Sequence, residues 1–195
     1  MPIKKGADRV VVLLPALGLV VKLPIIRVVR FLHSFAGCFK DRRFVLKRLW
    51  MGVETPVSYH FGFRGMLFKG LHANWCEFWF YWRTRNAFLQ PTYFSFFGLL
   101  NIQQMGEPCL LDDVDVWSQL SGLTKRDVWK DSHHFANASN FGFWNGKFRM
   151  FDYGSKASRE VAALHGAYIV EHFDPTYSWE EVKKRLIAEK EKKID

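Results

Sequence analysis

Apolar runs broken by turn residues open the chain. Residues 9–23, RVVVLLPALGLVVKL, hold two β-branched runs on either side of Pro15 and Gly18, and this pattern predicts a strand, a turn and a second strand. Over residues 24–35 the apolar positions recur at helical spacing, and the positions between them are largely basic. The sequence therefore predicts a strand pair followed by a helix with a basic outer face.

The middle of the chain predicts a second helix and a second pair of strands. Irregular strands and turns are expected over residues 53–70. A helix is expected over residues 71–86, LHANWCEFWFYWRTRN, in which the lone acid Glu77 lies among aromatic residues. Residues 91–108 predict two strands that are broken at Gly98 and end at a Gly/Pro-rich boundary. This boundary is the expected hinge between two parts of the chain.

Residues 140–155, NFGFWNGKFRMFDYGS, predict a β-hairpin in the last part of the chain. Asn145 and Gly146 form its turn, because both residues tolerate the positive φ angles of a two-residue hairpin loop. The preceding segment, residues 127–139, is rich in Asp, His, Asn and Ser and is predicted to be a loop. Helices are predicted over residues 110–124 and 156–173, and from the capping box of Ser178 and Glu181 onward.

The composition favours a folded, basic protein. Of the 195 residues, 49% are hydrophobic, and the net charge of +9 favours an anionic partner such as a nucleotide, a nucleic acid or a membrane surface. The three cysteines, Cys38, Cys76 and Cys109, lack the spacing of a zinc site. We therefore expect reduced thiols and a cytoplasmic location.

Four polar residues stand out by their type and by their order along the predicted elements. Lys22 lies on a predicted strand and Glu77 on a predicted helix, while Asn140 and Asp152 lie 12 positions apart at the two ends of the predicted hairpin. The order of strand lysine, helix acid, hinge, asparagine, hairpin and Asp-Tyr-Gly resembles the protein-kinase-like superfamily.

The resemblance implies a fold and a ligand. The fold is α+β and two-lobed, with a small antiparallel-sheet lobe in residues 1–106 and a reduced, mainly helical lobe in residues 107–195. The ligand is ATP with Mg²⁺, and the expected activity is phosphoryl transfer to a protein or small-molecule acceptor. Lys22 would pair the phosphates and Glu77 would hold this lysine, while Asn140 and Asp152 would bind the metal.

Glu77 also has possible partners close to it in sequence. A carboxylate buried among aromatic side chains is costly without a partner. Arg83 and Arg85 follow on the same predicted helix and are the alternatives to Lys22.

Three features depart from the family pattern. The first predicted turn holds one glycine, Gly18, in place of a Gly-rich phosphate loop, and the usual substrate-docking helices do not fit in the short C-terminal remainder. Phe135 stands five residues before Asn140, where the family has its catalytic aspartate. Asp131 and His134 are the nearby substitutes, and Asp131 ranks first because a carboxylate is usual beside the metals. Phe135 favours the alternative of a catalytically inactive pseudokinase.

A third interpretation is that the chain is a binding protein and not a kinase relative. Residues 40–48, KDRRFVLKR, form a basic cluster next to the predicted amphipathic helix. Such a cluster is typical of proteins that bind nucleic acid or an anionic membrane surface.

Overall fold

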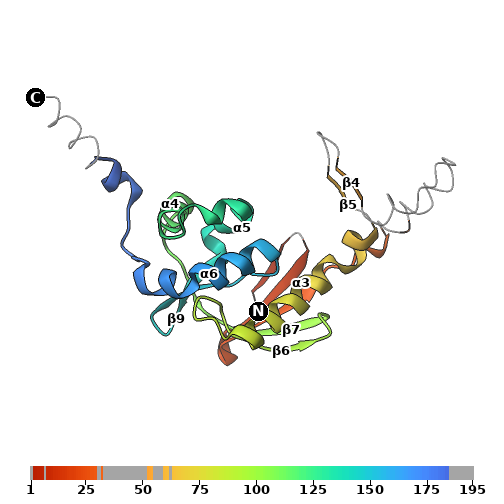
Figure 1. Cartoon of the computed structure of the whole chain (residues 1–195). Coiled ribbons are helices and arrows are strands. Elements are labelled where there is room, and N and C mark those ends of the chain that lie inside the picture. The colour runs from red at the N-terminus through yellow and green to blue at the C-terminus, as the bar shows by residue number, and fades with distance from the viewer. Residues whose placement is uncertain are drawn as a thin grey trace, which may run out of the picture. The chain divides into compact units, whose positions relative to one another are not determined.

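The structure is a computed structural model that describes residues 2–6, 8–29, 32, 52–54, 59–61 and 63–184. The protein is α+β and forms two compact units (Figure 1). The first unit comprises residues 1–79 and 92–105, and the second comprises residues 80–91 and 106–195. The predicted boundary at residue 106 coincides with the last change of unit, whereas residues 80–91 belong to the second unit.

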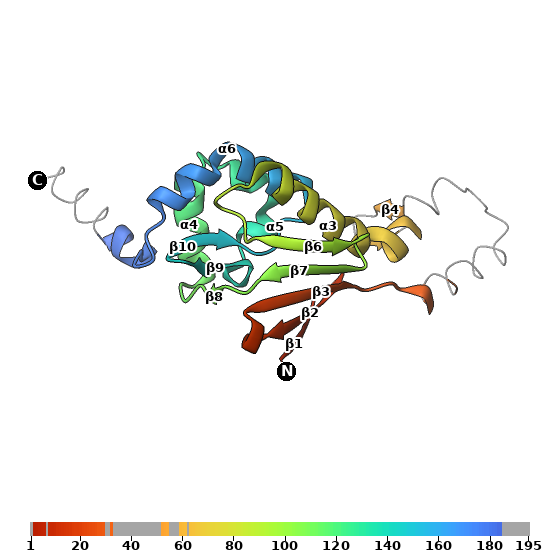
Figure 2. The same ribbon diagram turned by 90° about the horizontal axis from the view of Figure 1, so that it is seen from below.

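The first unit contains a five-stranded antiparallel sheet with the order β1-β2-β3-β7-β6 (Figure 2). The strands are β1 (Ile3–Lys5), β2 (Arg9–Leu14), β3 (Leu19–Pro24), β6 (Thr92–Phe96) and β7 (Leu100–Gln104). A 3₁₀ turn, η1 (Pro15–Leu17), ends at Gly18 with a φ of 62° and joins β2 to β3. Both predicted strand pairs are confirmed, and β1 is an additional edge strand.

Helix α3 (Phe63–Thr84) carries Glu77 and begins at Phe63 rather than at the predicted residue 71. Two short strands, β4 (Gly52–Glu54) and β5 (Tyr59–Phe61), pair ahead of it. The early start was missed because Gly70 resembles part of a turn segment, yet it lies inside the helix. A Cβ at Gly70 would lie 2.4 Å from the carbonyl oxygen of Asp8, so glycine allows the helix to approach the sheet closely.

The predicted basic helix is described only in part. The strand β3 extends through Pro24, and the helical residues of this region include Val28, Val29 and Leu32. Residues 33–50, which include the basic cluster at residues 40–48, lie outside the described part of the chain.

The second unit combines helices with a three-stranded antiparallel sheet of order β10-β9-β8. Its elements are β8 (Glu107–Pro108), α4 (Asp113–Leu123), η2 (Asp127–Asp131), α5 (Ser132–Phe135), η3 (Ala138–Asn140), β9 (Phe141–Trp144), β10 (Lys147–Met150) and α6 (Lys156–His172). The predicted hairpin is confirmed, and Asn145 and Gly146 have φ angles of 51° and 69°. The two predicted helices are also confirmed, and a further helical segment begins at Trp179, directly after Ser178.

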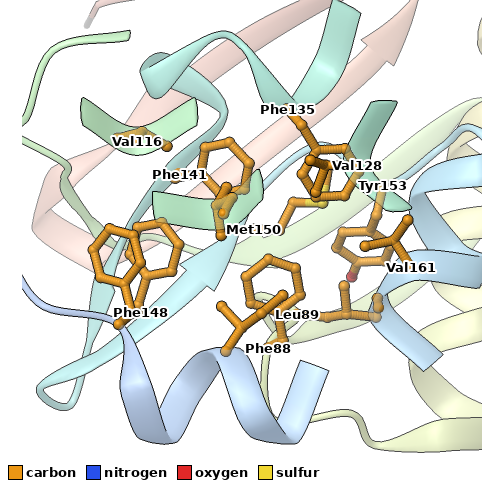
Figure 3. Packing of buried hydrophobic residues seen from close by; sticks show 14 of the residues in the cluster. Phe88, Leu89, Val116, Val128, Phe135, Phe141, Phe148, Met150, Tyr153 and Val161 are labelled. Atoms are coloured by element: carbon orange, nitrogen blue, oxygen red, sulfur yellow. The ribbon is translucent and has the colours of Figure 1, made fainter. Parts of the chain in front are cut away.

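The segment predicted to be a loop, residues 127–139, instead forms three short helical turns. Its polar composition suggested a loop, but Val128 and Phe135 are fully buried. Burial of these two side chains holds the segment against the core of the second unit (Figure 3). This core also includes Phe88, Leu89, Val116, Phe141, Phe148, Met150, Tyr153 and Val161.

Candidate functional site

Lys22 lies on β3, which has a neighbouring strand on each side. Its cross-strand neighbours are Val11 on β2 and Asn101 on β7. Since alternate residues of a strand share a face, Arg9 lies on the same face as Val11 and diagonally opposite Lys22. All three polar side chains of this row, those of Arg9, Lys22 and Asn101, are buried.

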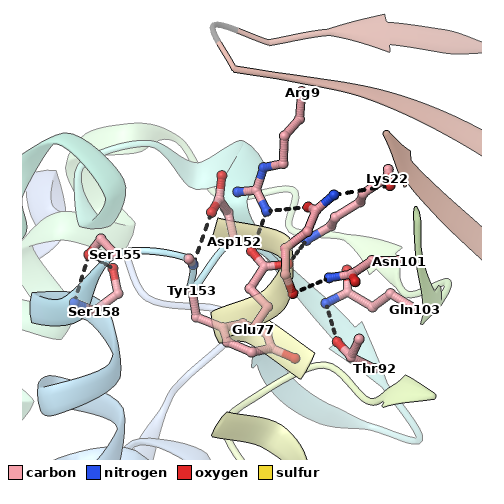
Figure 4. A network of polar contacts seen from close by, with 12 residues as sticks. Arg9, Lys22, Glu77, Thr92, Asn101, Gln103, Asp152, Tyr153, Ser155 and Ser158 are labelled. Atoms are coloured by element: carbon pink, nitrogen blue, oxygen red, sulfur yellow. Dashed lines mark hydrogen bonds and ion pairs between the residues drawn. The ribbon is translucent and has the colours of Figure 1, made fainter. Parts of the chain in front are cut away.

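Glu77 joins two of these side chains in one buried ion-pair cluster (Figure 4). Its Oε2 accepts from Nζ of Lys22 at 3.0 Å, and its Oε1 accepts from the guanidinium of Arg9 at 2.6 Å. The predicted pair of Lys22 and Glu77 is therefore present. Of the local alternatives, Arg85 lies with its guanidinium 3.8 Å from the centre of the Trp82 ring.

Two buried amides support this cluster. Nδ2 of Asn74 donates to the backbone carbonyls of Lys22 (3.3 Å) and Gly98 (2.9 Å), which ties α3 to β3 and to the β6–β7 turn. Nδ2 of Asn101 donates to the carbonyl of Asn74 at 2.7 Å. Oδ1 of Asn101 is buried with no hydrogen-bond partner among the described residues. A buried acceptor of this kind is a place where a water molecule or a polar ligand is expected.

Asn140 and Asp152 lie at the open end of the β9–β10 hairpin, one just before β9 and the other just after β10. The amide of Phe151 donates to the carbonyl of Asn140 at 2.7 Å, which continues the pairing of the two strands by one step. Nδ2 of Asn140 donates to the carbonyl of His134 at 2.9 Å, so Oδ1 is the side-chain atom that can bind a cation. The carboxylate of Asp152 is half-buried and accepts from the amide of Gly154 at 3.5 Å.

This pair of oxygen donors fits Mg²⁺ in chemistry but does not form a complete metal site. Mg²⁺ is usually held by one or two carboxylates together with waters and substrate phosphates. Among the described residues, no group of three or more His, Cys, Asp or Glu side chains could hold a metal ion. Asn140 and Asp152 would therefore hold Mg²⁺ only together with phosphate oxygens of a nucleotide.

Asp131 is the centre of a polar network in the second unit. Its Oδ1 accepts from Nδ1 of His134 at 2.7 Å, and its Oδ2 accepts from the hydroxyls of Ser155 and Ser158. Ser155 also caps α6, because its Oγ accepts from the amide of Ser158 at 3.0 Å (Figure 4). Asp131 thus links the turn that carries His134 to the beginning of α6.

The protonation states within this network follow from the hydrogen bonds. Burial alone would raise the pKa of Asp131, but the hydrogen bonds from His134, Ser155 and Ser158 together outweigh burial and lower this pKa to about 2. Asp131 is therefore ionised at neutral pH and can only accept hydrogen bonds. It follows that Nδ1 of His134 carries the proton of this hydrogen bond.

Phe135 and the Asp-Tyr-Gly sequence both take part in packing within the second unit. Phe135 is fully buried, and its ring lies 6.0 Å from that of Phe141, centre to centre. Tyr153, within the Asp-Tyr-Gly sequence, is also fully buried and donates its hydroxyl to the carbonyl of Gln90 at 2.8 Å. Arg159 donates to the carbonyl of Gly154 at 2.5 Å and so holds the same segment.

Sequence reasoning missed Arg9, Ser155, Ser158 and Arg159. Arg9 could have been found from the pairing of β2 with β3. Val11 lies opposite Lys22, and Arg9, two residues earlier, points to the same face of the sheet. The N-cap pattern at Ser155 contains a signal for the start of α6, but not for the carboxylate of Asp131, which is 24 residues away.

No protein-family model matches the chain, and neither a curated protein nor a solved structure matches it.

Proposed function

We propose that the protein is a kinase-like protein that binds ATP with Mg²⁺ and transfers the terminal phosphoryl group to an acceptor hydroxyl. The observation that carries this proposal is the buried pair of Lys22 on β3 and Glu77 on α3, at 3.0 Å. A strand lysine held by a helix glutamate is the arrangement that protein kinases need to bind phosphates. The five-stranded antiparallel sheet and the hairpin that ends in Asp-Tyr-Gly follow in the order that the resemblance requires.

The candidate residues divide into two roles in the proposed chemistry. Lys22 contributes the positive charge that binds the phosphates, and Glu77 fixes the position of this lysine. Asn140 and Asp152 contribute oxygen ligands for the metal. When bound, Mg²⁺ would neutralise charge that develops on the phosphoryl oxygens.

His134 is the better candidate for the group that accepts the hydroxyl proton, and this reverses the sequence-based ranking. Both oxygens of Asp131 accept hydrogen bonds within the protein, and its pKa of about 2 makes it a weak base. Asp131 fixes the orientation of His134 through Nδ1, which leaves Nε2 as the ring nitrogen that could accept a proton. Asp131 is then a positioning residue.

The buried Phe135 favours a second candidate function, a pseudokinase that binds nucleotide without turnover. This side chain can neither accept a proton nor orient a hydroxyl. The two functions share the nucleotide and differ only in the transfer step.

Equilibrium binding of ATP, with and without Mg²⁺, tests the shared part. We expect Mg²⁺-dependent binding to the wild type and at least a tenfold weaker affinity for Lys22→Met. The matched control is Lys69→Met, because Lys69 is half-exposed and pairs at 2.7 Å with Asp8. Equal affinity of the Lys22 variant and the wild type would contradict the assignment.

Measurement of ATP turnover separates the two functions. An active enzyme should lose turnover in His134→Ala while retaining ATP binding. If the wild type binds Mg-ATP and shows no turnover with a broad set of hydroxyl acceptors, the pseudokinase is the correct function.

A further inference from the structure

The β6–β7 turn has an unusual residue for its backbone conformation. Its two central residues, Phe97 and Gly98, have φ angles of 48° and 78°. Two consecutive positive φ angles favour Asn-Gly, and the β9–β10 hairpin has this pair at Asn145 and Gly146. A bulky aromatic residue at a positive φ is rare. The first unit therefore places Phe where the backbone itself favours Asn.

This turn is held firmly against α3. A Cβ at Gly98 would lie 2.2 Å from the carbonyl oxygen of Leu71, so the turn touches the helix backbone. The carbonyl of Gly98 accepts from Asn74 at 2.9 Å, and its amide donates to the hydroxyl of Ser95 at 3.2 Å. These contacts hold Gly98, the residue after Phe97, against α3.

The side chain of Phe97 remains 70% exposed, although its ring stacks on Trp75 at 5.9 Å. Further exposed apolar side chains belong to the same hairpin and to α3. We define the aromatic surface as Phe68, Trp79, Phe94, Phe96, Phe97 and Leu99. Ring contacts connect the hairpin and helix parts of this surface, since the ring of Phe97 lies 5.2 Å from that of Phe96 and 5.9 Å from that of Trp75, and Trp75 lies 5.5 Å from Trp79, centre to centre. An exposed apolar surface of this kind marks an interaction site.

The charges around the aromatic surface indicate its partner. Over residues 63–84 and 92–104 the sequence contains one acidic residue, Glu77, which is buried and paired. The whole chain has a net charge of +9. Exposed Trp and Phe side chains insert at the boundary between lipid headgroups and acyl chains, and anionic headgroups attract a basic protein. A second copy of the chain would be repelled by the same net charge.

We propose that the aromatic surface docks on an anionic lipid bilayer, with Phe97 as the residue that inserts most deeply. The protein then associates with one face of the membrane, and this association requires neither ATP nor Mg²⁺. It is independent of the proposed kinase-like function, because the aromatic surface does not include Lys22, Glu77, Asn140 or Asp152.

The test is flotation of the full chain with vesicles of phosphatidylcholine that contain about 30% phosphatidylserine. We expect the wild type to float with these vesicles, and Phe97→Asn to partition roughly tenfold less, because it loses the burial of one aromatic side chain. The substitution Phe97→Asn introduces the residue that the turn favours, so its melting temperature should equal or exceed that of the wild type. Leu99→Ser should weaken partitioning as well.

The control variant is Leu110→Asn, which removes a single side chain that is 94% exposed in the second unit. It should float like the wild type. Failure of the wild type to bind the vesicles, or equal partitioning of Phe97→Asn, would overturn the proposal. A lipid-independent dimer that Phe97→Asn dissociates, measured by light scattering, would assign the surface to self-association instead.

Discussion

At the scale of single residues, Glu77 is the carboxylate that two buried cations share. The variant Glu77→Gln takes away the negative charge that Arg9 and Lys22 both contact, at 2.6 Å and 3.0 Å. Breaking a buried ion pair by removing one partner typically costs 3–5 kcal/mol, so we expect a loss of roughly this size in the free energy of unfolding. Lys22→Met should cost less, because it leaves the pair of Arg9 and Glu77 intact.

Urea denaturation of both variants measures these losses. Glu160→Gln is a surface control, because Glu160 is exposed and pairs with an exposed lysine, and we expect a change within about 0.5 kcal/mol. A Glu77→Gln variant as stable as the wild type would show that the ion-pair cluster does not contribute to the free energy of unfolding.

The second residue-scale prediction concerns the pH dependence of stability at Asp131. Hydrogen bonds lower the pKa of Asp131 in the folded state to about 2, below its ordinary value of 3.8. A lowered pKa stabilises the fold above the unfolded-state value, and this stabilisation is lost as the pH falls toward the folded-state value. We expect Asp131→Asn to be about 2 kcal/mol less stable than the wild type at neutral pH.

The difference between the two proteins is the informative quantity, since other carboxylates titrate in both. It should shrink as the pH falls from about pH 4 to pH 2. Chemical denaturation at a series of pH values measures it. If the difference in the free energy of unfolding grows on acidification, the pKa of Asp131 is not lowered by folding and the prediction is wrong.

At the scale of the elements, two helix glycines should respond oppositely to the same change. Gly166 in α6 lies against the side chain of Asn86, and an added Cβ would approach its Oδ1 to 2.5 Å. Asn86 in turn donates to the carbonyl of Ala162 at 2.6 Å and accepts from the amide of Phe88. We expect Gly166→Ala to destabilise the protein by about 1–3 kcal/mol, because this buried link must shift.

Gly122 in α4 is the matched control, because no atom lies within 4 Å of a Cβ added there. Gly122→Ala should stabilise the protein by about 0.5–1 kcal/mol through helix propensity alone. Thermal or urea denaturation compares the two variants. The same sign of change at both positions would contradict the packing described for α6.

The element scale also shows how far the sequence predicts the fold. Periodicity and turn residues predict β2, β3, β6, β7 and the β9–β10 hairpin, because these elements are specified by local pattern. The start of α3 is missed, because Gly70 has a tertiary role that neighbouring residues do not reveal. The turns at residues 127–139 are missed for a related reason, since the burial of Val128 and Phe135 outweighs a polar composition.

The sequence also predicts some residues of the candidate site and misses others. The pair of Lys22 and Glu77 was predictable, because a buried acid needs a cation and the resemblance supplies one. Arg9 and the serine partners of Asp131 were not predicted, because they meet only through register and long-range packing.

At the scale of the whole molecule, residues 1–79 and 92–105 form one unit, and residues 80–91 and 106–195 form the other. Of the helices in the described residues, none combines the length and apolarity that a membrane crossing needs. The central proposal is that the protein binds ATP with Mg²⁺, and that Lys22 and Asp152 both contribute to this binding. Loss of either side chain should then lower the affinity of the protein for ATP.

The most direct measurement is the melting temperature of the protein with ATP, in the presence and absence of Mg²⁺. A ligand that binds only the folded state at about 100 times its Kd stabilises the fold by about 2.7 kcal/mol. We predict a rise in melting temperature that requires Mg²⁺ in the wild type and in the control Asp174→Asn, whose carboxylate only closes a surface turn with Thr176. Asp152→Asn should lose the Mg²⁺-dependent part. No shift in the wild type, or an equal shift in Asp152→Asn, would contradict the account.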